Sequence, residues 1–346
     1  MAETARKLRV GVLGLTHDHI WNMLPDLARS PLGELAAAAD PNAELREKFS
    51  AGYGCPQVFA SYEALLDEVA LDAVLIYADN ATSASLAVQA AQRGLHALVE
   101  KPMAANLAGA ERMLAQAGQA GVLLMVNWPF AWRRGLRQAL ALAQAGKIGE
   151  VFSLKYRAAH AGPKEYGCSP YFYNWLHDPE LNGAGALMDY CSYGAVLARY
   201  LLGMPQQVVG VAGRLQKDYI HTDDNAVIVM QWERAIAIAE ASWTQVGNLT
   251  SYQTVVYGSQ GTLFVGAGAE GKVYLADDQN PDGLELSVPD LPVEQRNGTS
   301  YFLQQASQRL PVVGLCSAQV GRDAQEILEA GLLSARRGAT VTLPLG

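Results

Sequence analysis

The first residues that suggest chemistry lie at the end of an apolar run near the N-terminus. Residues 8–13 have a strand-like pattern and lead into Gly14 and a polar turn, after which a helical pattern begins at residue 20. Glycine permits such a sharp turn because it has no Cβ. The N-terminus of the following helix presents backbone N–H groups and a partial positive charge, which suit a pyrophosphate. We therefore interpret this stretch as a phosphate loop.

This loop departs from the dinucleotide fingerprint G-x-G-x-x-G, which requires glycine at positions 14, 16 and 19. Thr16 and His19 occupy the second and third positions. The Thr16 hydroxyl could donate to a phosphate oxygen, and His17 or His19, if protonated, would add positive charge. Thr16 and Asp18 are also good helix caps. We expect capping of the helix together with phosphate binding.

Asp40 ends the second apolar run, about twenty residues beyond the loop, where dinucleotide sites carry an acidic residue. Such a residue accepts hydrogen bonds from the adenosine ribose and repels a 2′-phosphate, so it favours NAD over NADP. The alternative is an Asp-Pro turn without a ligand.

Asp189 and Tyr193 stand four residues apart in a helical pattern that covers residues 186–202. At this spacing they share one face of the helix, a turn apart. A free phenol has a pKa of about 10 and is a poor base at neutral pH unless a cation lies beside it. From the residue type alone, Tyr193 is more typical of a buried aromatic on a core helix than of an acid/base.

The first 126 residues alternate short apolar runs with helical patterns. This alternation predicts βαβ units and a parallel sheet covered on both faces. The expected strands are residues 9–13, 35–39, 73–77, 97–99 and 122–126, and the expected helices are residues 20–28, 44–51, 62–69, 83–92 and 108–117.

The pattern changes after residue 127. Short turns separate the later strands, which predicts an antiparallel sheet. The expected elements are a helix (134–145), a strand (152–158), a loop (160–182), a helix (186–202), strands (208–215, 226–232, 235–243, 252–257 and 262–265), two helices (301–309 and 318–335) and a last strand (340–343). The chain is therefore predicted to be α/β, with a doubly wound parallel domain in residues 1–127 and a second α/β domain with an open, mainly antiparallel sheet in residues 128–346.

Composition excludes several classes of protein. Of the 346 residues, 50% are apolar and 17% are charged, which suits two domains with large cores and excludes extended disorder. The net charge is −8, and no long Lys/Arg run is present, so neither nucleic acid nor an anionic membrane is an expected partner. Four scattered cysteines, the lack of a signal-peptide pattern and the lack of a long apolar span predict a cytoplasmic protein.

Two longer stretches carry a resemblance to a known family. They are LDAVLIYADNATSASLAVQAAQRGLHALVEKPMA (71–104) and NWLHDPELNGAGALMDYCSYGAVLARYLLG (174–203). The E-K-P triplet, followed later by a GxGALxD helix, resembles the glucose-fructose oxidoreductase/inositol dehydrogenase family, Gfo/Idh/MocA. Segments 145–151, 258–265 and 334–345 also resemble it. The resemblance implies a Rossmann domain followed by an α/β domain for substrate binding, whose open sheet often joins dimers or tetramers.

The resemblance also implies catalytic roles for Lys101, Asp189 and Tyr193. In this family the lysine of E-K-P lies between nicotinamide and substrate, and the following proline, here Pro102, often has a cis peptide bond. Many members carry D-x-G-x-H where this chain has Asp189-Tyr-Cys-Ser-Tyr193. A tyrosine in this place is the acid/base of the branch that includes glucose-fructose oxidoreductase and dihydrodiol dehydrogenases. We expect Lys101 to lower the pKa of Tyr193, and Asp189 to hold the substrate or Lys101.

Further residues are expected around the ligands. NAD is the expected cofactor, with NADP possible, and Asn80, Thr82 and Glu100 would flank it. His160, Trp175 and His177 come from loops that line the substrate pocket in the family, although either histidine is equally consistent with a place outside the pocket. No metal is expected, because no histidine pair has the spacing or the carboxylate company of a zinc motif.

The resemblance implies an NAD(P)-dependent oxidoreductase that acts on a secondary alcohol of a sugar, cyclitol or related polyol, and that forms a homodimer or homotetramer through its C-terminal sheet. The alternative is a relative that binds the nucleotide without net redox turnover, as a glycosidase or a ligand-sensing regulator. The altered phosphate loop would fit a regulator. A sensor would not need Lys101, Asp189 and Tyr193 together.

Overall fold

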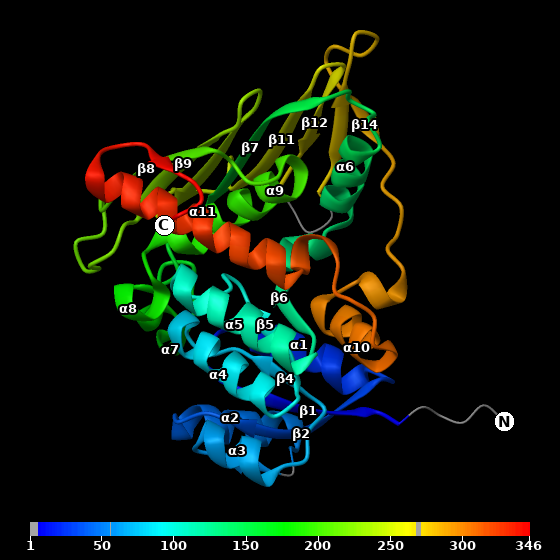
Figure 1. The fold of residues 1–346 in the computed structure, drawn as a ribbon, viewed down its shortest axis with the longest axis vertical. Helices are drawn as coiled ribbons and strands as arrows, with labels where there is room; N and C mark the ends of the chain where they lie inside the picture. The colour runs from blue at the N-terminus through cyan, green and yellow to red at the C-terminus, as the bar shows by residue number, and fades with distance from the viewer. Residues whose placement is uncertain (1–5, 56, 268–270) are drawn as a thin grey trace, which may run out of the picture.

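The computed structural model describes residues 6–55, 57–267 and 271–346 and contains two β-sheets with helices packed around them (Figure 1). The strands of the first sheet end at Asn127, and those of the second begin at Val151. The two sheets therefore divide where the sequence pattern changes.

The first sheet has six parallel strands in the order β3-β2-β1-β4-β5-β6. The five predicted strands are confirmed, and their apolar runs are almost completely buried because helices cover both faces. The edge strand β3 was not predicted, since two residues are too short to show a pattern. The strands are β1 (Leu8–Leu13), β2 (Gly33–Ala39), β3 (Val58–Phe59), β4 (Ala73–Ile76), β5 (His96–Glu100) and β6 (Leu124–Asn127).

All five helices predicted for this part are confirmed. Three of them begin at a side chain that accepts a backbone N–H, namely Ser61, Asp79 and Asn106. The helices are α1 (His19–Arg29), α2 (Ala43–Tyr53), α3 (Tyr62–Glu68), α4 (Asn80–Gln92) and α5 (Leu107–Ala120). Because β2 and β4 lie on opposite sides of β1, the strand order reverses there, and a crevice opens above the strand ends.

The second sheet has nine strands in the order β14-β13-β12-β11-β7-β10-β9-β8-β15. Its neighbours are antiparallel except for β7 and β10, which are parallel, so the sheet is mixed and mainly antiparallel. The prediction missed β13 and β14. The strands are β7 (Val151–Ala159), β8 (Gln207–Gly213), β9 (Asn225–Gln231), β10 (Ile236–Ser242), β11 (Tyr252–Gly258), β12 (Gly261–Val265), β13 (Val273–Ala276), β14 (Leu284–Leu286) and β15 (Val341–Thr342).

Helices α6 (Arg134–Gln144), α9 (Ser192–Leu202) and α11 (Ala318–Arg337) cover one face of this sheet (Figure 1). Gly194 lets α9 lie against β10, because a Cβ at Gly194 would come within 2.4 Å of the Cβ of Ala239. The predicted helix over 186–202 begins instead with a π-helical turn, η2 (Leu187–Cys191), and continues as α9.

The prediction of a loop at residues 160–182 is wrong in part, because this segment contains α7 (Pro170–Leu176) and α8 (Pro179–Asn182). Each begins with proline in its first turn after a capping residue, Ser169 for α7 and Asp178 for α8. Their aromatic and polar residues give no clear helical period, so the sequence pattern did not reveal them.

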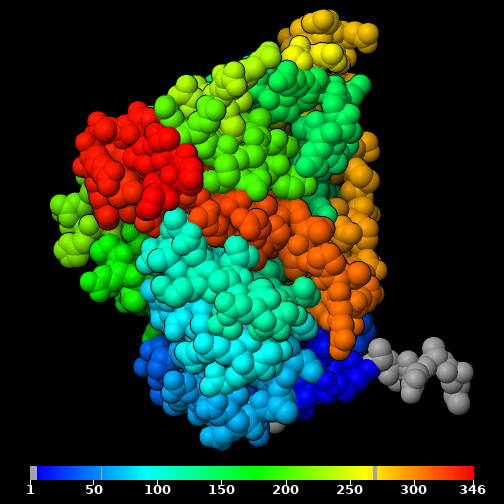
Figure 2. Space-filling view, in the orientation of Figure 1, coloured from blue at the N-terminus to red at the C-terminus, as the bar shows by residue number. Residues whose placement is uncertain are grey.

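The chain returns to the first sheet at its end. Helix α10 (Gly298–Gln308) packs on α1 and β5, and α11 packs on both α5 and the second sheet. Figure 2 shows α11 filling the space between the two parts on this face. The proposed boundary at residue 127 therefore separates the two sheets but not all of their helices. No helix in the described part of the chain is long and apolar enough to cross a membrane.

The turn after β1 depends on glycine at position 14. Gly14 has φ of +91°, and a Cβ there would lie 2.4 Å from the backbone nitrogen of Ala78 and 2.7 Å from the carbonyl carbon of Tyr77. We expect Gly14→Ala to lower the free energy of unfolding by about 1–3 kcal/mol, because the backbone of Tyr77 and Ala78, just after β4, must shift.

Thermal unfolding measures this effect. Gly118→Ala in α5 is the matched control, because a Cβ there meets nothing within 4 Å. The free energy of unfolding of that variant should rise by about 0.5–1 kcal/mol, because alanine is more stable than glycine inside a helix. Equal stability of Gly14→Ala and the wild type would contradict the close approach of the loop to the backbone just after β4.

Candidate active site

Lys101, Asp189 and Tyr193 line one cavity of about 210 Å³ where the two parts of the chain meet. We call this the central cavity. Lys101 follows β5, Asp189 lies in η2 and Tyr193 lies in the first turn of α9. The complete lining is His19, Lys101, Pro129, Phe130, Arg133, Tyr156, His160, Pro163, Tyr166, Cys168, Phe172, Leu176, Asp189, Tyr190, Tyr193 and Tyr252.

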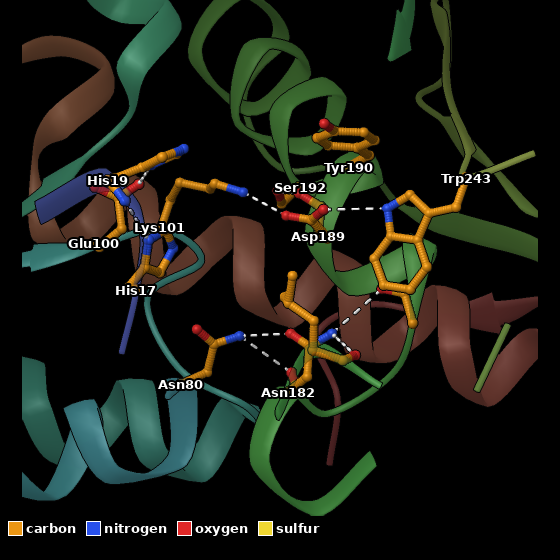
Figure 3. A network of polar contacts seen from close by, with 12 residues as sticks. His17, His19, Asn80, Glu100, Lys101, Asn182, Asp189, Tyr190, Ser192 and Trp243 are labelled. Carbon is orange, nitrogen blue, oxygen red and sulfur yellow. Dashed lines mark hydrogen bonds and ion pairs between the residues drawn. The ribbon is translucent and has the colours of Figure 1, made fainter. Parts of the chain in front are cut away.

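Lys101 and Asp189 form a buried ion pair (Figure 3). Lys101 Nζ donates to Asp189 Oδ1 at 2.5 Å, and the two side chains are only 3% and 8% exposed. The indole Nε1 of Trp243 donates to the other carboxylate oxygen at 3.3 Å. The Lys101–Pro102 peptide bond is cis, as the resemblance implied. The carboxylate therefore holds the ammonium at the edge of the cavity.

Tyr193 presents its ring, rather than its hydroxyl, to Lys101. Lys101 Nζ lies 4.9 Å from the ring centre. Burial raises the pKa of Tyr193 well above its ordinary value, the charges of Asp189 and Glu100 raise it further, and Arg133 lowers it. The expectation of a lowered pKa is therefore wrong, because burial and the charges of Asp189 and Glu100 outweigh the nearby cations. Tyr193 is a protonated phenol in the central cavity.

The phosphate loop packs against α7. His17 is buried, and its ring lies 4.3 Å from Phe172 and 5.6 Å from Trp175, measured between centroids. Burial holds the pKa of His17 well below its usual value, and the charges of His19 and Lys101 lower it further. The expectation that His17 could supply positive charge is therefore wrong.

Asp18 does not cap α1. Its carboxylate accepts bonds from the backbone N–H and the hydroxyl of Ser169, at 2.7 and 2.6 Å. This contact fastens the start of α7 to the phosphate loop.

Thr16 lines a second hollow of about 440 Å³, the strand-end cleft, above the ends of β1, β2 and β4. The cleft lies where the strand order of the first sheet reverses. It is lined by Thr16, Pro41, Asn42, Tyr62, Asp79, Thr82, Pro170, Tyr171, Asn174, Trp175, Asp178 and Leu181. This crevice is the usual place for a nucleotide in an open α/β sheet.

Asp40 does not line the strand-end cleft, contrary to its expected place at a ribose. It is completely buried, and Oδ2 accepts the N–H of Leu15 at 2.7 Å. Oδ1 accepts the backbone N–H and the amide of Asn42, at 2.8 and 2.7 Å. Its carboxylate turns inward because the N–H of Leu15 in the phosphate loop needs an acceptor. Asn42 takes its place in the lining.

The other residues expected beside a cofactor separate into two groups. Thr82 lines the strand-end cleft. Asn80 is buried, and its amide donates to the side-chain oxygen of Asn182 at 2.7 Å, which ties α4 to α8 (Figure 3). Glu100 accepts the Asn127 amide at 2.8 Å and lies 3.0 Å from His19 Nδ1. Asn80 and Glu100 line neither hollow, so they position other groups.

His17, His19 and Glu100 form a cluster whose potential ligand atoms lie within 4.8 Å of one another. Hydrogen bonds already use these groups. His17 Nδ1 accepts the N–H of His19 at 3.2 Å, and His19 bonds to Glu100. A cation could bind only by displacing these bonds. The expectation that no metal binds stays a prediction.

Only one of the three expected substrate contacts lines the central cavity. His160 does so, and its Nδ1 accepts the N–H of Gly162 at 2.8 Å. Burial is the main cause that lowers the pKa of His160 to about 4. Trp175 lines the strand-end cleft instead. His177 lies outside both linings and packs on Trp243, with ring centres 5.8 Å apart.

An aromatic wall around Tyr193 was not predicted from the sequence. The ring of Tyr156 lies 5.9 Å from that of Tyr193, and the ring of Tyr190 lies 6.0 Å from it. The hydroxyls of Tyr190 and Tyr252 are 3.0 Å apart. Arg133 completes this side of the cavity. These residues look like ordinary strand and helix residues in the sequence, and only the folding of the second part of the chain brings them together.

Because Lys101 and Asp189 form a buried ion pair, removal of the charge of only one partner should lower the free energy of unfolding. Asp189→Asn keeps the shape of the side chain but leaves the buried ammonium of Lys101 uncompensated. We therefore expect the free energy of unfolding to fall by about 3–5 kcal/mol. Replacement of both groups, in Lys101→Met with Asp189→Leu, should cost less, because no buried charge remains. Urea unfolding followed by circular dichroism measures both variants. An Asp189→Asn protein that unfolds at the wild-type urea concentration would contradict a buried pair.

The lowered pKa of His160 predicts a pH dependence of stability. The pKa is about 4 in the folded protein against an ordinary value of 6.5, so the unfolded chain takes up a proton more readily. The contribution of His160 to stability is complete above pH 6.5 and decreases as the pH falls toward 4. We expect His160→Asn to lose less stability than the wild type between pH 7.5 and pH 5 in urea unfolding. An equal loss in both proteins would mean that His160 does not titrate in this way.

Comparison with known proteins agrees with this geometry. A family model described as "Oxidoreductase family, NAD-binding Rossmann fold" matches residues 8–128, and one described as "GFO/IDH/MocA C-terminal domain" matches residues 136–264.

Two relatives illustrate the range of similarity. A dTDP-3,4-didehydro-2,6-dideoxy-alpha-D-glucose 3-reductase from Streptomyces violaceoruber is 34% identical over 212 residues, which are 61% of this chain and 59% of that relative. This match thus spans less than two thirds of the relative's length. A D-apiose dehydrogenase from Paraburkholderia graminis is 27% identical over 96% of this chain and 88% of its own.

Among solved structures, the WlbA dehydrogenase from Bordetella pertussis, crystallised with NADH and UDP-GlcNAcA, has the same fold. Its TM-score is 0.81 at 22% identity, and the match covers 99% of this chain and 100% of that chain. The chain therefore belongs to the Gfo/Idh/MocA family of oxidoreductases, and its first part is an NAD-binding Rossmann fold.

Proposed function

We propose that this protein is an NAD(P)-dependent dehydrogenase or reductase that acts on a secondary alcohol of a sugar, cyclitol or related polyol. One observation carries the proposal. Lys101 from the first sheet and Asp189 and Tyr193 from the second part converge on the central cavity. The named activities of the relatives, a sugar 3-reductase and a sugar dehydrogenase, support the same class of reaction.

The strand-end cleft fits a dinucleotide. It lies above the strand ends where the strand order reverses, and the hydroxyls of Thr16 and Thr82 line it. When bound, the nicotinamide supplies or accepts the hydride. We propose that Thr16 and the turn at Gly14 hold the phosphates.

We propose NAD rather than NADP as the preferred cofactor. None of the described side chains that line the strand-end cleft is cationic, and Asp79 and Asp178 are acidic. A 2′-phosphate in the cleft would therefore meet no counter-ion there. Arg46, the nearest candidate in sequence, donates to the backbone oxygens of Asp40 and Pro41.

The protein's own residues would handle the proton and orient the substrate. In the direction of reduction, the protonated Tyr193 hydroxyl would donate its proton to the substrate oxygen and become a phenolate. In oxidation the phenol would first release its proton to solvent, and the resulting phenolate would take the proton of the substrate hydroxyl. The ammonium of Lys101 would hold that same oxygen. Asp189 would keep Lys101 in place through their 2.5 Å bond. His160 would contact another substrate hydroxyl.

We also propose that the protein forms a homodimer or homotetramer through the second sheet. The face of the sheet that faces away from the helices exposes Val209, Val211 and Ile236, at 41%, 68% and 44%. An exposed apolar sheet face of this kind is typical of a surface that pairs with another copy.

Calorimetry with NAD⁺ and NADP⁺, followed by a sugar and polyol panel read at 340 nm, tests the function. We expect NAD⁺ to bind and at least one polyol to give NADH. Tyr193→Phe should lower kcat by about 10²–10⁴-fold, because it removes the proton carrier. Its stability should change little, since the Tyr193 hydroxyl makes no hydrogen bond with the described residues.

Tyr200→Phe is the matched control, because its hydroxyl bonds to Gln144 away from the central cavity, and it should keep the wild-type rate. Tight NAD⁺ binding without any absorbance change would instead favour a family member that has no net redox turnover.

A further inference from the structure

Arg133 is a cation in the central cavity that has no anionic partner among the described residues. It lies between the 3₁₀-helix η1 (Pro129–Trp132) and α6, and it is half-buried. Its guanidinium carbon lies 5.4 Å from the ring centre of Tyr252. The guanidinium makes no hydrogen bond or ion pair with any residue that the structure describes. The ring of Tyr252 is therefore a contact of the guanidinium that leaves its N–H donors available to a ligand.

The other ionisable groups that line the cavity leave this charge uncompensated. Lys101 and Asp189 neutralise each other at 2.5 Å. The pKa of His160 is lowered to about 4, and the pKa of Cys168 is raised to about 12, so both are neutral at pH 7. The imidazole of His19 bonds to Glu100, which lies outside the lining. Arg133 is thus the cation of this lining that has no ion-pair partner among the described residues.

We infer that the substrate is an acidic sugar or polyol, whose carboxylate binds Arg133 while Lys101 and Tyr193 hold the reacting hydroxyl. This inference rests on the proposed function. Guanidinium and carboxylate groups match in a planar, two-bond arrangement that an ammonium cannot offer. Such a pair would give the half-buried guanidinium the partner that it otherwise lacks.

The cavity favours a carboxylate over a phosphate ester. One guanidinium balances the single charge of a carboxylate, whereas a phosphate near neutral pH carries more charge and the carboxylate of Asp189 lies in the same lining. The volume of about 210 Å³ suits a single sugar acid. Arg133 lies beside Tyr252, whereas Lys101 lies beside Asp189. The carboxylate and the reacting hydroxyl would therefore belong to different carbons of the ligand.

The test compares matched substrates with the full-length protein and NAD⁺. Each pair consists of a neutral sugar and its acid, such as D-glucose with D-gluconate or D-glucuronate, and D-glucose 6-phosphate is the third arm. We expect the acid to have the highest kcat/KM in its set. Arg133→Gln should raise KM for the acid by about 10- to 100-fold and leave KM for the neutral sugar unchanged. Arg133→Lys should restore part of the affinity, because it keeps the charge but not the planar fork.

Arg134→Gln is the matched control. It removes the same charge one residue away, outside the cavity lining, where Arg134 pairs with Asp290. This variant should keep the wild-type KM for both members of each pair. Circular dichroism and NADH affinity verify that each variant is folded.

Binding of D-gluconate and D-glucuronate to the enzyme–NADH complex, measured by calorimetry, gives a readout that does not require turnover. Weaker acid binding in Arg133→Gln supports the inference, even when no substrate in the panel is oxidised. The inference is overturned by a preference for the neutral sugar or the phosphate, by an equal effect of Arg133→Gln on acid and neutral sugar, or by unchanged acid binding in that variant. Oxidation of neutral sugars alone would leave the proposed function intact, whereas the lack of any NADH formation would count against the function itself.

Discussion

The buried ion pair between Lys101 and Asp189 is the contact on which the candidate site depends. It joins the end of β5 in the first sheet to η2 above the second sheet, with 2.5 Å between Nζ and Oδ1. Two charges leave water only when each compensates the other. The pair therefore fixes how the two parts of the chain meet, and it brings the ammonium to the edge of the central cavity. The bond from Trp243 to the second carboxylate oxygen keeps Asp189 from turning away.

A second set of contacts holds the strand-end cleft. Helix α7 lies along the phosphate loop, where Asp18 accepts two bonds from Ser169 and the ring of His17 packs on Phe172. Tyr171 also bonds to Glu44 of α2. Residues from beyond 160 thus form one wall of a cleft whose floor is the first sheet. This arrangement explains why the loop tolerates Thr16 and His19 in place of glycines. Its shape depends on contacts with α7 and on the bond from Leu15 to Asp40, in addition to the turn at Gly14.

The electrostatics of the central cavity follow from burial. Burial raises the pKa of Tyr193 and lowers that of His160, so a phenol and a neutral imidazole face the substrate space. Asp189 compensates Lys101, which leaves Arg133 as the charge that the ligand itself would complement. The same burial that keeps Tyr193 protonated suits it to donate a proton, and a ligand that draws Lys101 toward the substrate oxygen would bring positive charge closer to the phenol.

The sequence by itself determined the alternation of strands and helices in residues 8–127, the change of pattern after it, and the motif positions Lys101, Asp189 and Tyr193. Hydrophobic period, glycine at the turn and capping residues act over a few neighbours, so they can be read along the chain. Short elements such as β3, α7 and α8 were not predicted, because they are too short or too irregular to show a hydrophobic period. The parallel pairing of β7 with β10 could not be predicted from the sequence, because strand order is a property of the whole sheet.

Only the tertiary structure decided where polar side chains point. Asp40 turns inward to an N–H that only the folded loop presents, and Asn80 pairs with Asn182, 102 residues away in sequence. His177 and Trp175 lie outside the central cavity, whereas Arg133, Tyr156 and Tyr252 enter it from separate elements. The direction of the Tyr193 pKa was also beyond the sequence, because desolvation and the neutralisation of Lys101 by Asp189 arise only when the two parts of the chain pack together.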